Sequence, residues 1–467
     1  MTPIINRKGI RVPKVEPKVV ICEIVQTPSC PMGVPVNAVD LGVAAVNELL
    51  LRGRKGGYLT DLNIFDALIN GEVLRTPFTS GSAKFIARGA RLYDSTVPED
   101  VSQACASSLA AAELGYHLIA SGEKRVIIVT GIEAMQRTPF LLEADERDSK
   151  LNSQMRKWAA GEGLIGKVLG KTFQLFGYGK HYGPGLSIGP RFLESGLSTS
   201  QNFLDPYAGN MVATAHPLGN LVGSTRQSGD HIAFESHARA SSAKGRAMHA
   251  LNKVRYFVPG VGFIEEDGNV RPIKDDSMAK IAAMKGLPGA GGLITAANAS
   301  NMGALGVALL MMDEQTAIEL GAPILCEVLG FGTAGVDGKI MGSGPVPAVD
   351  LVLSRFGLLD ADGRIANPER FGHWEVNEAF ATVVDAFQRY WKIDPAIVNP
   401  YGGGIAMGHP LGATGARILG LLARAMSLGD YELAVFALCM AGGIGKAVLI
   451  RRYVNENAAR VTGKKAA

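Results

Sequence analysis

Apolar runs and amphipathic segments alternate along the first part of the chain. Continuous apolar runs predict strands buried on both faces, and apolar residues at helical spacing predict helices packed against them. In chain order the predicted elements are a strand at Val19–Val25, a helix at Val39–Leu51, a strand near Ala67–Leu74, an alanine-rich helix at Cys105–Ala120 that ends at Ser121-Gly122, and a strand at Arg125–Gly131. This alternation predicts an α/β fold with a parallel sheet covered by helices on both faces.

The C-terminal part repeats this order. The segment Pro323–Gly330 is similar to Val19–Gln26, even to a cysteine followed by glutamate. A helix pattern at Val346–Phe356, a helix pattern at His409–Met426 and the strand "LAVFALC" then follow. We therefore predict two similar halves, in which Cys105 and His409 occupy equivalent places at helix starts and face one crevice.

A different kind of segment separates the halves. Residues 138–276 are polar, glycine-dotted and less periodic, and they are too long for a simple loop. We predict an inserted lobe here that covers the site. The N-terminal half would then comprise 1–137 and 277–318, and the C-terminal half 319–467.

Composition is that of an ordinary globular protein, with 47% hydrophobic and 19% charged residues. A formal net charge of +4 over 467 residues is small and does not indicate nucleic-acid binding. The 58 glycines occur without low-complexity runs, so they indicate tight turns and close backbone approaches.

The cysteines indicate a reducing compartment. They are odd in number and widely spaced, which argues against a disulfide framework: Cys22, Cys30, Cys105, Cys326 and Cys439. No apolar run reaches the length of a transmembrane helix, and the basic first twenty residues lack the apolar core of a secretory signal. We expect a cytoplasmic protein, or a mitochondrial matrix protein if the source is eukaryotic.

Four motifs carry candidate chemistry. Cys105, in "SQACASS", opens a helix, where the helix dipole favours a thiolate. His409 lies in "YGGGIAMGHPLGATGAR", whose glycines suit a backbone that passes close to a ligand. Cys439 begins "CMAGGIGKAVLI" at the end of a buried strand, and Asn377 lies in "HWEVNEAFA" between a strand and a helix. For an isolated cysteine, a buried apolar residue is the more common interpretation. For Asn377 alone, a helix cap is as good an interpretation as a functional residue.

Together these motifs closely resemble the thiolase family, and in the same order along nearly the whole chain. The resemblance implies a duplicated βαβαβαββ fold in α-β-α-β-α layers, an acyltransferase with coenzyme A as co-substrate, and no tightly bound cofactor or metal. It also relates "MVATAH" and "TAANAS" to family elements that contact the substrate. By that resemblance Met211, Ala296, Ser300 and Phe380 are candidates for CoA and acyl contacts.

The resemblance implies ping-pong covalent catalysis. His409 would take the proton of Cys105, whose thiolate attacks the 3-keto carbon of a 3-oxoacyl-CoA. Cys439 would act as the acid or base at the acetyl-CoA enolate. One anionic oxygen would be stabilised by His409 and a water held by Asn377, and the other by backbone N–H groups of Cys105 and Ala441.

Several positions depart from the family pattern. Gln26 replaces an arginine before Thr27-Pro28, Thr130-Gly131 replaces a glycine pair, His216 replaces a glutamate, and Ala441 stands where many members have glycine. The family's Asn-Asp after its "NAS" element is displaced by "NMGALG". None of these changes removes a reacting atom.

Three activities are compatible with these motifs. The leading hypothesis is a degradative 3-oxoacyl-CoA thiolase of fatty-acid β-oxidation, nearest the trifunctional-enzyme β-subunit type. An acetyl-CoA acetyltransferase that makes acetoacetyl-CoA differs mainly in pocket size. A decarboxylating 3-oxoacyl synthase shares the fold, but Cys439 argues against it, and a non-catalytic scaffold is disfavoured because all four reacting groups are present.

The resemblance also suggests partners. We expect a homodimer or a dimer of dimers, with a hydratase–dehydrogenase α-subunit as a possible partner. The segment Gly163–Lys180 mixes apolar and basic residues, as an interfacial helix would, so peripheral membrane contact is a hypothesis. A solvated lobe helix explains the same pattern equally well, and the basic residues at 150–180 could also meet CoA phosphates.

Overall fold

The computed structural model describes residues 17–74, 81–137, 140–141, 194–195 and 211–454. The chain divides into two compact units, one of residues 1–137 with 204–467 and one of residues 138–203. In the smaller unit, the described strands β6 (Phe140–Leu141) and β7 (Glu194–Ser195) pair antiparallel. All other described elements belong to the larger unit.

The larger unit is built on one continuous mixed sheet. Its strand order is β12-β13-β14-β11-β1-β10-β5-β3-β4, with β2 beside β10. The strands are β1 (Val19–Gln26), β2 (Cys30–Pro31), β3 (Ala67–Gly71), β4 (Val97–Val101), β5 (Val126–Ala134), β10 (Gly303–Asp313), β11 (Cys326–Gly335), β12 (Phe371–Val376), β13 (Leu433–Met440) and β14 (Ile444–Arg451).

The sheet repeats one pattern twice. In the first half β3 and β5 are parallel and β10 returns antiparallel beside β5. In the second half β12 and β13 are parallel and β14 returns antiparallel beside β13. The halves join where β1 pairs antiparallel with β11 over three residue pairs. The internal duplication expected from the sequence is confirmed by this matching order.

The expectation of a parallel sheet is wrong for part of it. Strands β13 and β14 are joined by the tight turn Ala441–Gly443, and a tight turn can only connect antiparallel neighbours. Strands β1 and β10 are also antiparallel. An apolar run indicates a strand buried on both faces but not the direction of its neighbours, so these runs alone did not separate the two kinds of strand.

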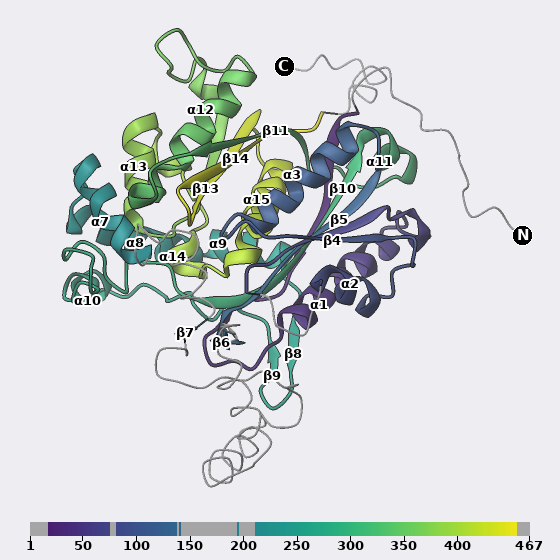
Figure 1. The fold of residues 1–467 in the computed structure, drawn as a ribbon, viewed down its shortest axis with the longest axis horizontal. Helices are drawn as coiled ribbons and strands as arrows, with labels where there is room; N and C mark the ends of the chain where they lie inside the picture. The colour runs from purple at the N-terminus through teal and green to yellow at the C-terminus, as the bar shows by residue number, and fades with distance from the viewer. Residues whose placement is uncertain (1–16, 75–80, 138–139, 142–193, 196–210, 455–467) are drawn as a thin grey trace, which may run out of the picture. The chain divides into compact units, whose positions relative to one another are not determined.

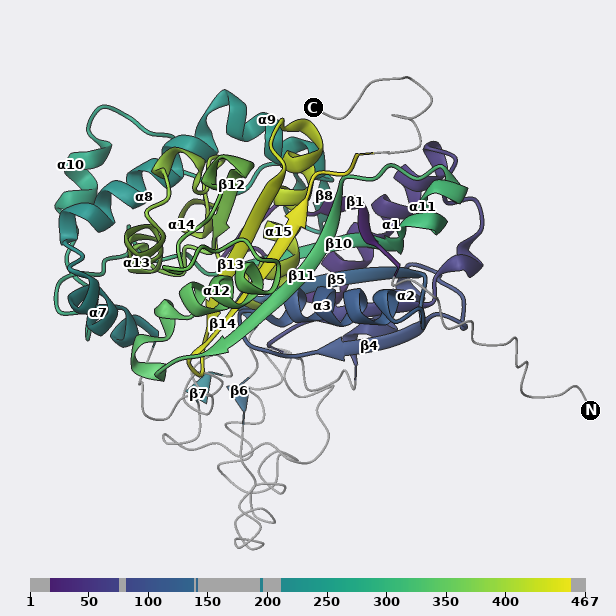
Figure 2. The same cartoon turned by 90° about the horizontal axis from the view of Figure 1, so that it is seen from above.

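Helices form three layers around the two halves of the sheet (Figure 1 and Figure 2). One outer layer holds α1 (Ala38–Lys55) and α2 (Ser82–Gly89), and the opposite one holds α12 (Pro345–Arg355) and α13 (Ala381–Trp391). Between them α3 (Ser107–Ala120) and α15 (Leu411–Leu428) share one core with both halves of the sheet. This arrangement confirms the α-β-α-β-α layering.

Further helices and a hairpin complete the larger unit. They are α7 (Met211–Val222), α8 (Arg226–Ser241), α9 (Ala243–Asn252), the hairpin β8 (Tyr256–Val258) and β9 (Gly262–Ile264), α10 (Ser277–Ala282), α11 (Glu314–Leu320) and α14 (Gly404–Met407). Helices α7 and α8 pack against α13. Residues 211–276, the C-terminal part of the predicted lobe, therefore cluster with the sheet-bearing unit. The basic segment at 150–180 and most of residues 138–210 lie outside the described ranges.

The centre of the molecule depends on a close approach of α3 and α15. A Cβ at Gly415 would lie 2.4 Å from the backbone nitrogen of Leu109, and one at Gly131 would lie 2.7 Å from the Cβ of Ser108. The Ser108 Oγ accepts a hydrogen bond of 2.9 Å from the backbone nitrogen of Ala416. The first turns of α3 and α15 therefore lie side by side.

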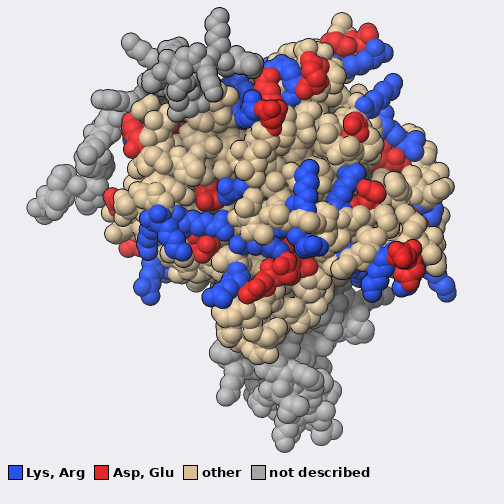
Figure 3. All heavy atoms as spheres, turned by 180° about the vertical axis from the view of Figure 1, so that it is seen from behind, with Lys and Arg blue, Asp and Glu red and all other residues tan. Residues whose placement is uncertain are grey.

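Charges on the surface are mixed. On the face in Figure 3, Lys and Arg side chains lie close to Asp and Glu side chains. Among the described residues, no helix is long and apolar enough to cross a bilayer.

Replacing Gly415 with alanine tests the helix approach. We expect Gly415→Ala to lower the free energy of unfolding by about 1–3 kcal/mol, because the new methyl group meets the backbone of Leu109. Urea unfolding followed by circular dichroism measures the change. Gly115→Ala is the matched control: its Cβ would lie 3.5 Å from Val129, an ordinary contact, so it should be neutral or slightly stabilising. Equal effects of the two substitutions would contradict this packing.

Candidate active site

The candidate residues follow strand ends. Cys105 comes four residues after β4, and Asn377 directly follows β12, where its backbone nitrogen donates to the carbonyl of Ala437 on β13 (3.0 Å). Cys439 is the last residue but one of β13. Since β12 and β13 are parallel, their carboxyl ends meet at one edge of the sheet, which places Asn377 and Cys439 near each other.

A strained turn presents Cys105. The preceding Ala104 has φ +42°, in the left-handed region that non-glycine residues rarely adopt. The Ser107 hydroxyl donates to the Ala104 carbonyl (2.7 Å) and accepts from the backbone nitrogen of Gln103 (2.9 Å). Helix α3 begins at Ser107, two residues later than the sequence pattern predicted. The cysteine therefore sits on the turn before the helix, partly exposed.

Backbone N–H groups and burial act in opposite directions on the Cys105 thiol. Burial raises its pKa to about 11, and the charge of Glu133 adds a smaller increase. Hydrogen bonds from the backbone N–H groups of Ala441 and of Cys105 itself lower the pKa by less. At neutral pH the resting group is consequently a thiol, with two N–H donors directed at its sulfur.

Cys439 lies close to Cys105. It is 1% exposed, and burial raises its pKa well above the usual value. The next largest cause is the charge of Cys105. Because such an interaction requires proximity, the two sulfurs, which come from different halves, lie near each other, and the raised pKa keeps Cys439 protonated at neutral pH.

The hydrogen bonds of His409 determine its tautomer. The Thr414 hydroxyl donates its only hydrogen to the carbonyl of Pro410 (2.9 Å). At the same time the Thr414 Oγ1 lies 2.8 Å from the Nδ1 of His409, so this contact requires a hydrogen on Nδ1. The Nε2 atom therefore carries a lone pair, and it lies 3.5 Å from the Nδ2 of Asn377. Such an imidazole can accept a proton at Nε2.

His409 is neutral at physiological pH. Burial, assisted by the positive charge of Arg417, lowers its pKa to about 3. The Arg417 side chain is buried on α15 and reaches the carbonyl of Gly408 (3.4 Å). Gly408 has φ +85°, which glycine tolerates, and its turn directs His409 toward the site.

Asn377 has an unused acceptor. It is fully buried, and its Oδ1 has no hydrogen-bond partner. A buried amide oxygen without a partner is costly, and a water or a substrate group supplies the missing donor in many proteins. The arrangement around Asn377 and His409 can thus hold one polar ligand atom.

Glu133 connects the first half to the helix of His409. Its carboxylate accepts from the backbone nitrogens of Gly412 (2.9 Å), Leu74 (3.2 Å) and Val73 (3.3 Å). Burial, followed by the charge of Glu72, raises the pKa of Glu133 to about 8. The contact with Gly412 fixes the start of α15 to the end of β5.

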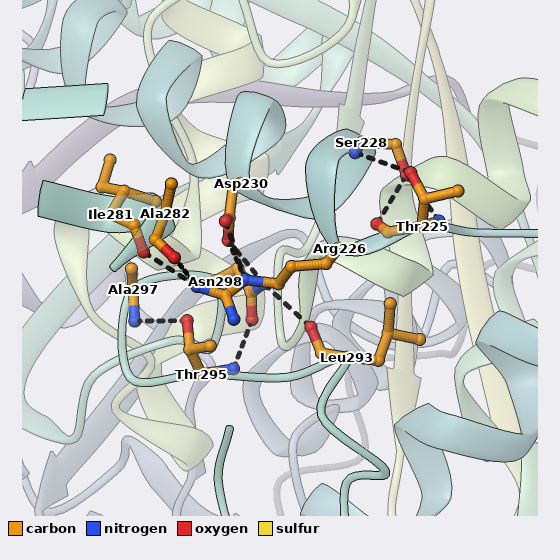
Figure 4. Close-up of polar contacts among 10 residues, drawn as sticks. All are labelled: Thr225, Arg226, Ser228, Asp230, Ile281, Ala282, Leu293, Thr295, Ala297 and Asn298. Atoms are coloured by element: carbon orange, nitrogen blue, oxygen red, sulfur yellow. Dashed lines mark hydrogen bonds and ion pairs between the residues drawn. The ribbon is translucent and has the colours of Figure 1, made fainter. Parts of the chain in front are cut away.

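The segment Thr295–Ser300 is held by a buried polar cluster (Figure 4). Asn298 donates through Nδ2 to Asp230 (3.1 Å) and to the carbonyl of Leu293 (3.1 Å). Arg226 binds the same carboxylate from one helical turn away (2.7 Å). This cluster fixes the loop that carries Ala296 and Ser300.

That loop borders the Asn377 segment. The backbone of Ser300 donates to the carbonyl of Ala379 (3.0 Å), and Ala299 forms a bridge with Phe380. Phe380 is buried, Ser300 is half-buried and Ala296 is exposed. Met211, at the start of α7, packs against the same apolar cluster as Cys105. Ser300 and Phe380 thus lie beside the Asn377 segment and Met211 near Cys105, and the roles of all four candidate contact residues stay predictions.

Sequence reasoning missed several residues. Thr414 lies five residues after His409 inside the recognised motif, so its spacing could have identified it. Asp230 and Asn298 are 68 residues apart and carry no local pattern that pairs them. Arg417 was recognised only as the last residue of the glycine-rich motif, and no role was predicted for it.

Comparisons with known proteins identify the family. The family model "Thiolase, N-terminal domain" matches residues 19–315, and "Thiolase, C-terminal domain" matches residues 322–452. The chain is 30% identical to a beta-ketoadipyl-CoA thiolase of Pseudomonas knackmussii over 93% of this chain and 99% of the relative. It is 28% identical to an acetyl-CoA acetyltransferase of Escherichia coli over 89% and 93%, respectively.

Solved structures give the same fold. The Bacillus anthracis acetyl-CoA acetyltransferase superposes with a TM-score of 0.77 at 26% identity, over 94% of this chain and all of that one. Human mitochondrial 3-ketoacyl-CoA thiolase in complex with CoA also gives 0.77, at 23% identity over 94% and 98%.

The raised pKa of Cys105 predicts its reactivity. Iodoacetamide reacts with the thiolate, so the alkylation rate of Cys105 should rise about tenfold per pH unit from pH 7 to pH 10. Peptide mass spectrometry at timed intervals measures this rate. Cys22, which is completely buried, serves as the internal control and should stay unmodified in the folded protein. A rate that levels off below pH 9 would contradict the raised pKa of Cys105.

Proposed function

Because the chain belongs to the thiolase family, it is a CoA-dependent acyltransferase that forms or cleaves carbon–carbon bonds in acyl-CoA, and we propose that it works degradatively. In this proposal it cleaves a 3-oxoacyl-CoA with CoA to give acetyl-CoA and a shortened acyl-CoA. The observation that carries the proposal is the buried His409, whose Nε2 lone pair lies 3.5 Å from the Nδ2 of Asn377, together with the free thiols of Cys105 and Cys439.

The first half-reaction begins at Cys105. The Nε2 of His409 takes the thiol proton, and the thiolate attacks C3 of the 3-oxoacyl-CoA. The bond between C2 and C3 breaks, so the acyl group remains on Cys105 as a thioester and the electron pair moves to the acetyl-CoA enolate. The anionic oxygen that forms at C3 accepts hydrogen bonds from the backbone N–H groups of Cys105 and Ala441, which already face the sulfur.

Cys439 completes the proton balance. Its thiol gives a proton to C2 of the enolate, and acetyl-CoA leaves. The raised pKa of Cys439 supports this step, because the group holds its proton until a strong base forms beside it. His409 and a water held by the unpartnered Oδ1 of Asn377 stabilise the enolate oxygen in this proposal.

CoA closes the cycle. Its thiol passes a proton to the Cys439 thiolate and attacks the thioester on Cys105. The Cys105 sulfur leaves and recovers its proton from His409, so each group returns to its starting state. Met211, Ala296, Ser300 and Phe380 are proposed to contact the acyl chain and the pantetheine arm.

The direction of the reaction and the preferred acyl chain length are part of the proposal. The relatives named above include both acetyl-CoA acetyltransferases and a beta-ketoadipyl-CoA thiolase. Biosynthesis of acetoacetyl-CoA by the same residues is therefore the second candidate. The Ser-Gln-Ala-Cys, "TAAN" and "CMAGG" segments support the trifunctional β-subunit type, and Cys439 argues against a decarboxylating synthase.

We further propose a homodimer. Strand β4 ends the sheet, its outer edge has no strand partner among the described residues, and Val97 on it is 42% exposed. Multi-angle light scattering tests the oligomeric state. A hydratase–dehydrogenase α-subunit, membrane contact and a cytoplasmic or matrix location stay predictions, for pull-down, liposome sedimentation and fractionation to test.

Thiolysis assays test the activity. We expect turnover of acetoacetyl-CoA or of a long-chain 3-oxoacyl-CoA when CoA is present, and acyl-enzyme only on Cys105 by mass spectrometry of quenched reactions. A kcat/KM that rises with chain length would favour degradation, and activity confined to acetoacetyl-CoA would favour the biosynthetic alternative. No turnover of either substrate, or acylation of another residue, would refute the proposal.

Thr414 tests the tautomer of His409. In Thr414→Val the Nδ1–H of His409 loses its acceptor, so kcat should fall about 10- to 100-fold while KM changes little. Thr414→Ser keeps the hydroxyl and is the matched control, which should retain most of the activity. Comparable losses in the two variants would mean that the methyl group, rather than the hydrogen bond, matters.

A further inference from the structure

Glu378, the residue after Asn377, is a buried carboxylate for which the proposed mechanism has no use. Glu378 is 2% exposed and lies in the segment between β12 and α13. Burying a carboxylate is costly unless several hydrogen bonds compensate it. The partners of this carboxylate therefore indicate why it is present.

Three donors surround the carboxylate. The Ser236 hydroxyl lies 2.6 Å from Oε2, the backbone nitrogen of Ile405 lies 3.0 Å from Oε2, and the Asn399 Nδ2 lies 2.9 Å from Oε1. The two nitrogens can only donate, and the Ser236 hydroxyl also donates here, because its oxygen accepts from two backbone nitrogens. The set matches an ionised carboxylate, although burial raises the pKa of Glu378.

Ser236 extends the set to the glycine-rich turn. Its oxygen accepts from the backbone nitrogens of Gly403 (3.1 Å) and Ala406 (3.3 Å), which leaves its one hydrogen for Glu378. A Cβ at Gly403 would lie 2.3 Å from the carboxyl carbon of Glu378. The glycine therefore allows the turn to pack directly on the carboxylate.

Asn399 ties the same carboxylate to β12. Its Oδ1 accepts from the backbone nitrogen of Val376 (2.8 Å), and its Nδ2 also donates to the Val376 carbonyl (2.9 Å). Asn399 has φ +47°, a conformation that asparagine tolerates better than most residues. Asn399 thus holds both the N–H and the carbonyl of Val376, the residue before Asn377.

These contacts join the two elements that carry Asn377 and His409. Asn377 precedes Glu378 directly, and α14, which begins one residue before Ile405, ends two residues before His409. Helix α8 contributes Ser236 as the third element. The separation of 3.5 Å between the Asn377 Nδ2 and the His409 Nε2 is accordingly set by elements that meet at one carboxylate.

We propose that Glu378 is a positioning residue for the reaction: it holds the Asn377 segment, α8 and the turn of His409 in register without contacting a reacting atom. This inference deepens the proposed function and rests on it. It predicts that loss of the carboxylate slows the chemical steps, because the base and the water-holding amide shift relative to each other, while substrate binding by other residues persists.

The test is the near-isosteric variant Glu378→Gln, in which one oxygen acceptor becomes a donor facing another donor. We expect kcat to fall on the order of 10- to 100-fold, while the KM values for the 3-oxoacyl-CoA and for CoA change by less than about threefold. Ser236→Ala should lower kcat in the same way, and the double variant should lose less than the product of the two single losses.

Glu375→Gln is the matched control. Glu375 lies on β12 three residues earlier, it is 1% exposed, and it is paired with His373 on the same strand at 2.7 Å. This variant should lower the thermal midpoint but keep kcat within about threefold of the wild type. A merely structural Glu378 would behave like Glu375, with reduced stability and an unchanged kcat, and that result would overturn the positioning role.

The two levels of the proposal fail in different ways. A wild-type protein that turns over neither acetoacetyl-CoA nor a long-chain 3-oxoacyl-CoA refutes the proposed function. An active wild type with an equally fast Glu378→Gln variant refutes only the positioning role. Losses in the Ser236→Ala and Glu378→Gln variants that multiply in the double variant would also overturn it, because the two residues would then act separately.

Discussion

The close approach of α3 and α15 is the constraint on which the site depends. It exists because Gly415 places no side chain between the helices and Gly131 lets strand β5 approach both of them, and the Ser108 hydroxyl bonds to the backbone of the partner helix. Each helix follows a turn that bears a reactive side chain, Cys105 or His409. Packing the two helix starts together thus brings the proposed nucleophile from one half to the proposed base from the other. The duplicated fold needs no loop of unusual length to do this.

The same packing explains why the resting site carries little charge. Burial raises the pKa of the Cys105 thiol and lowers that of the His409 imidazole, so both are neutral at pH 7. The N–H groups around Cys105 and the open Oδ1 of Asn377 are nevertheless arranged for negative charge. Groups placed for a charge that is absent at rest stabilise the states in which that charge develops. Catalytic stabilisation of this kind requires rigid elements, which the buried contacts of Glu133 and Glu378 provide.

Features encoded by neighbouring residues could be predicted from the sequence, whereas contacts between distant residues could not. Runs such as Val19–Val25 and Arg125–Gly131 are strands because they are apolar on both faces, and the repeated order indicated two halves. Strand direction depends on connections, so the antiparallel pairing of β1 with β11 could not be predicted from their two apolar runs. Cys105 and His409 could be identified because each lies in a short motif that forms the turn before a helix. Asn298 lies 68 residues from Asp230 along the chain, and only the folded structure brings the two together.

The departures from the family pattern show which backbone features matter. Ala441 is absent from the described residues with positive φ, whereas Gly442 and Gly443, with φ +91° and +74°, form the turn. An alanine at 441 therefore costs no strain, and its N–H still faces Cys105. Thr130 is tolerated for a related reason: its hydroxyl bonds to Asn70 (2.9 Å), while the glycine needed against Ser108 is retained at 131. The reaction requires N–H groups and close backbone contacts at defined places, and side chains can vary wherever they leave these intact.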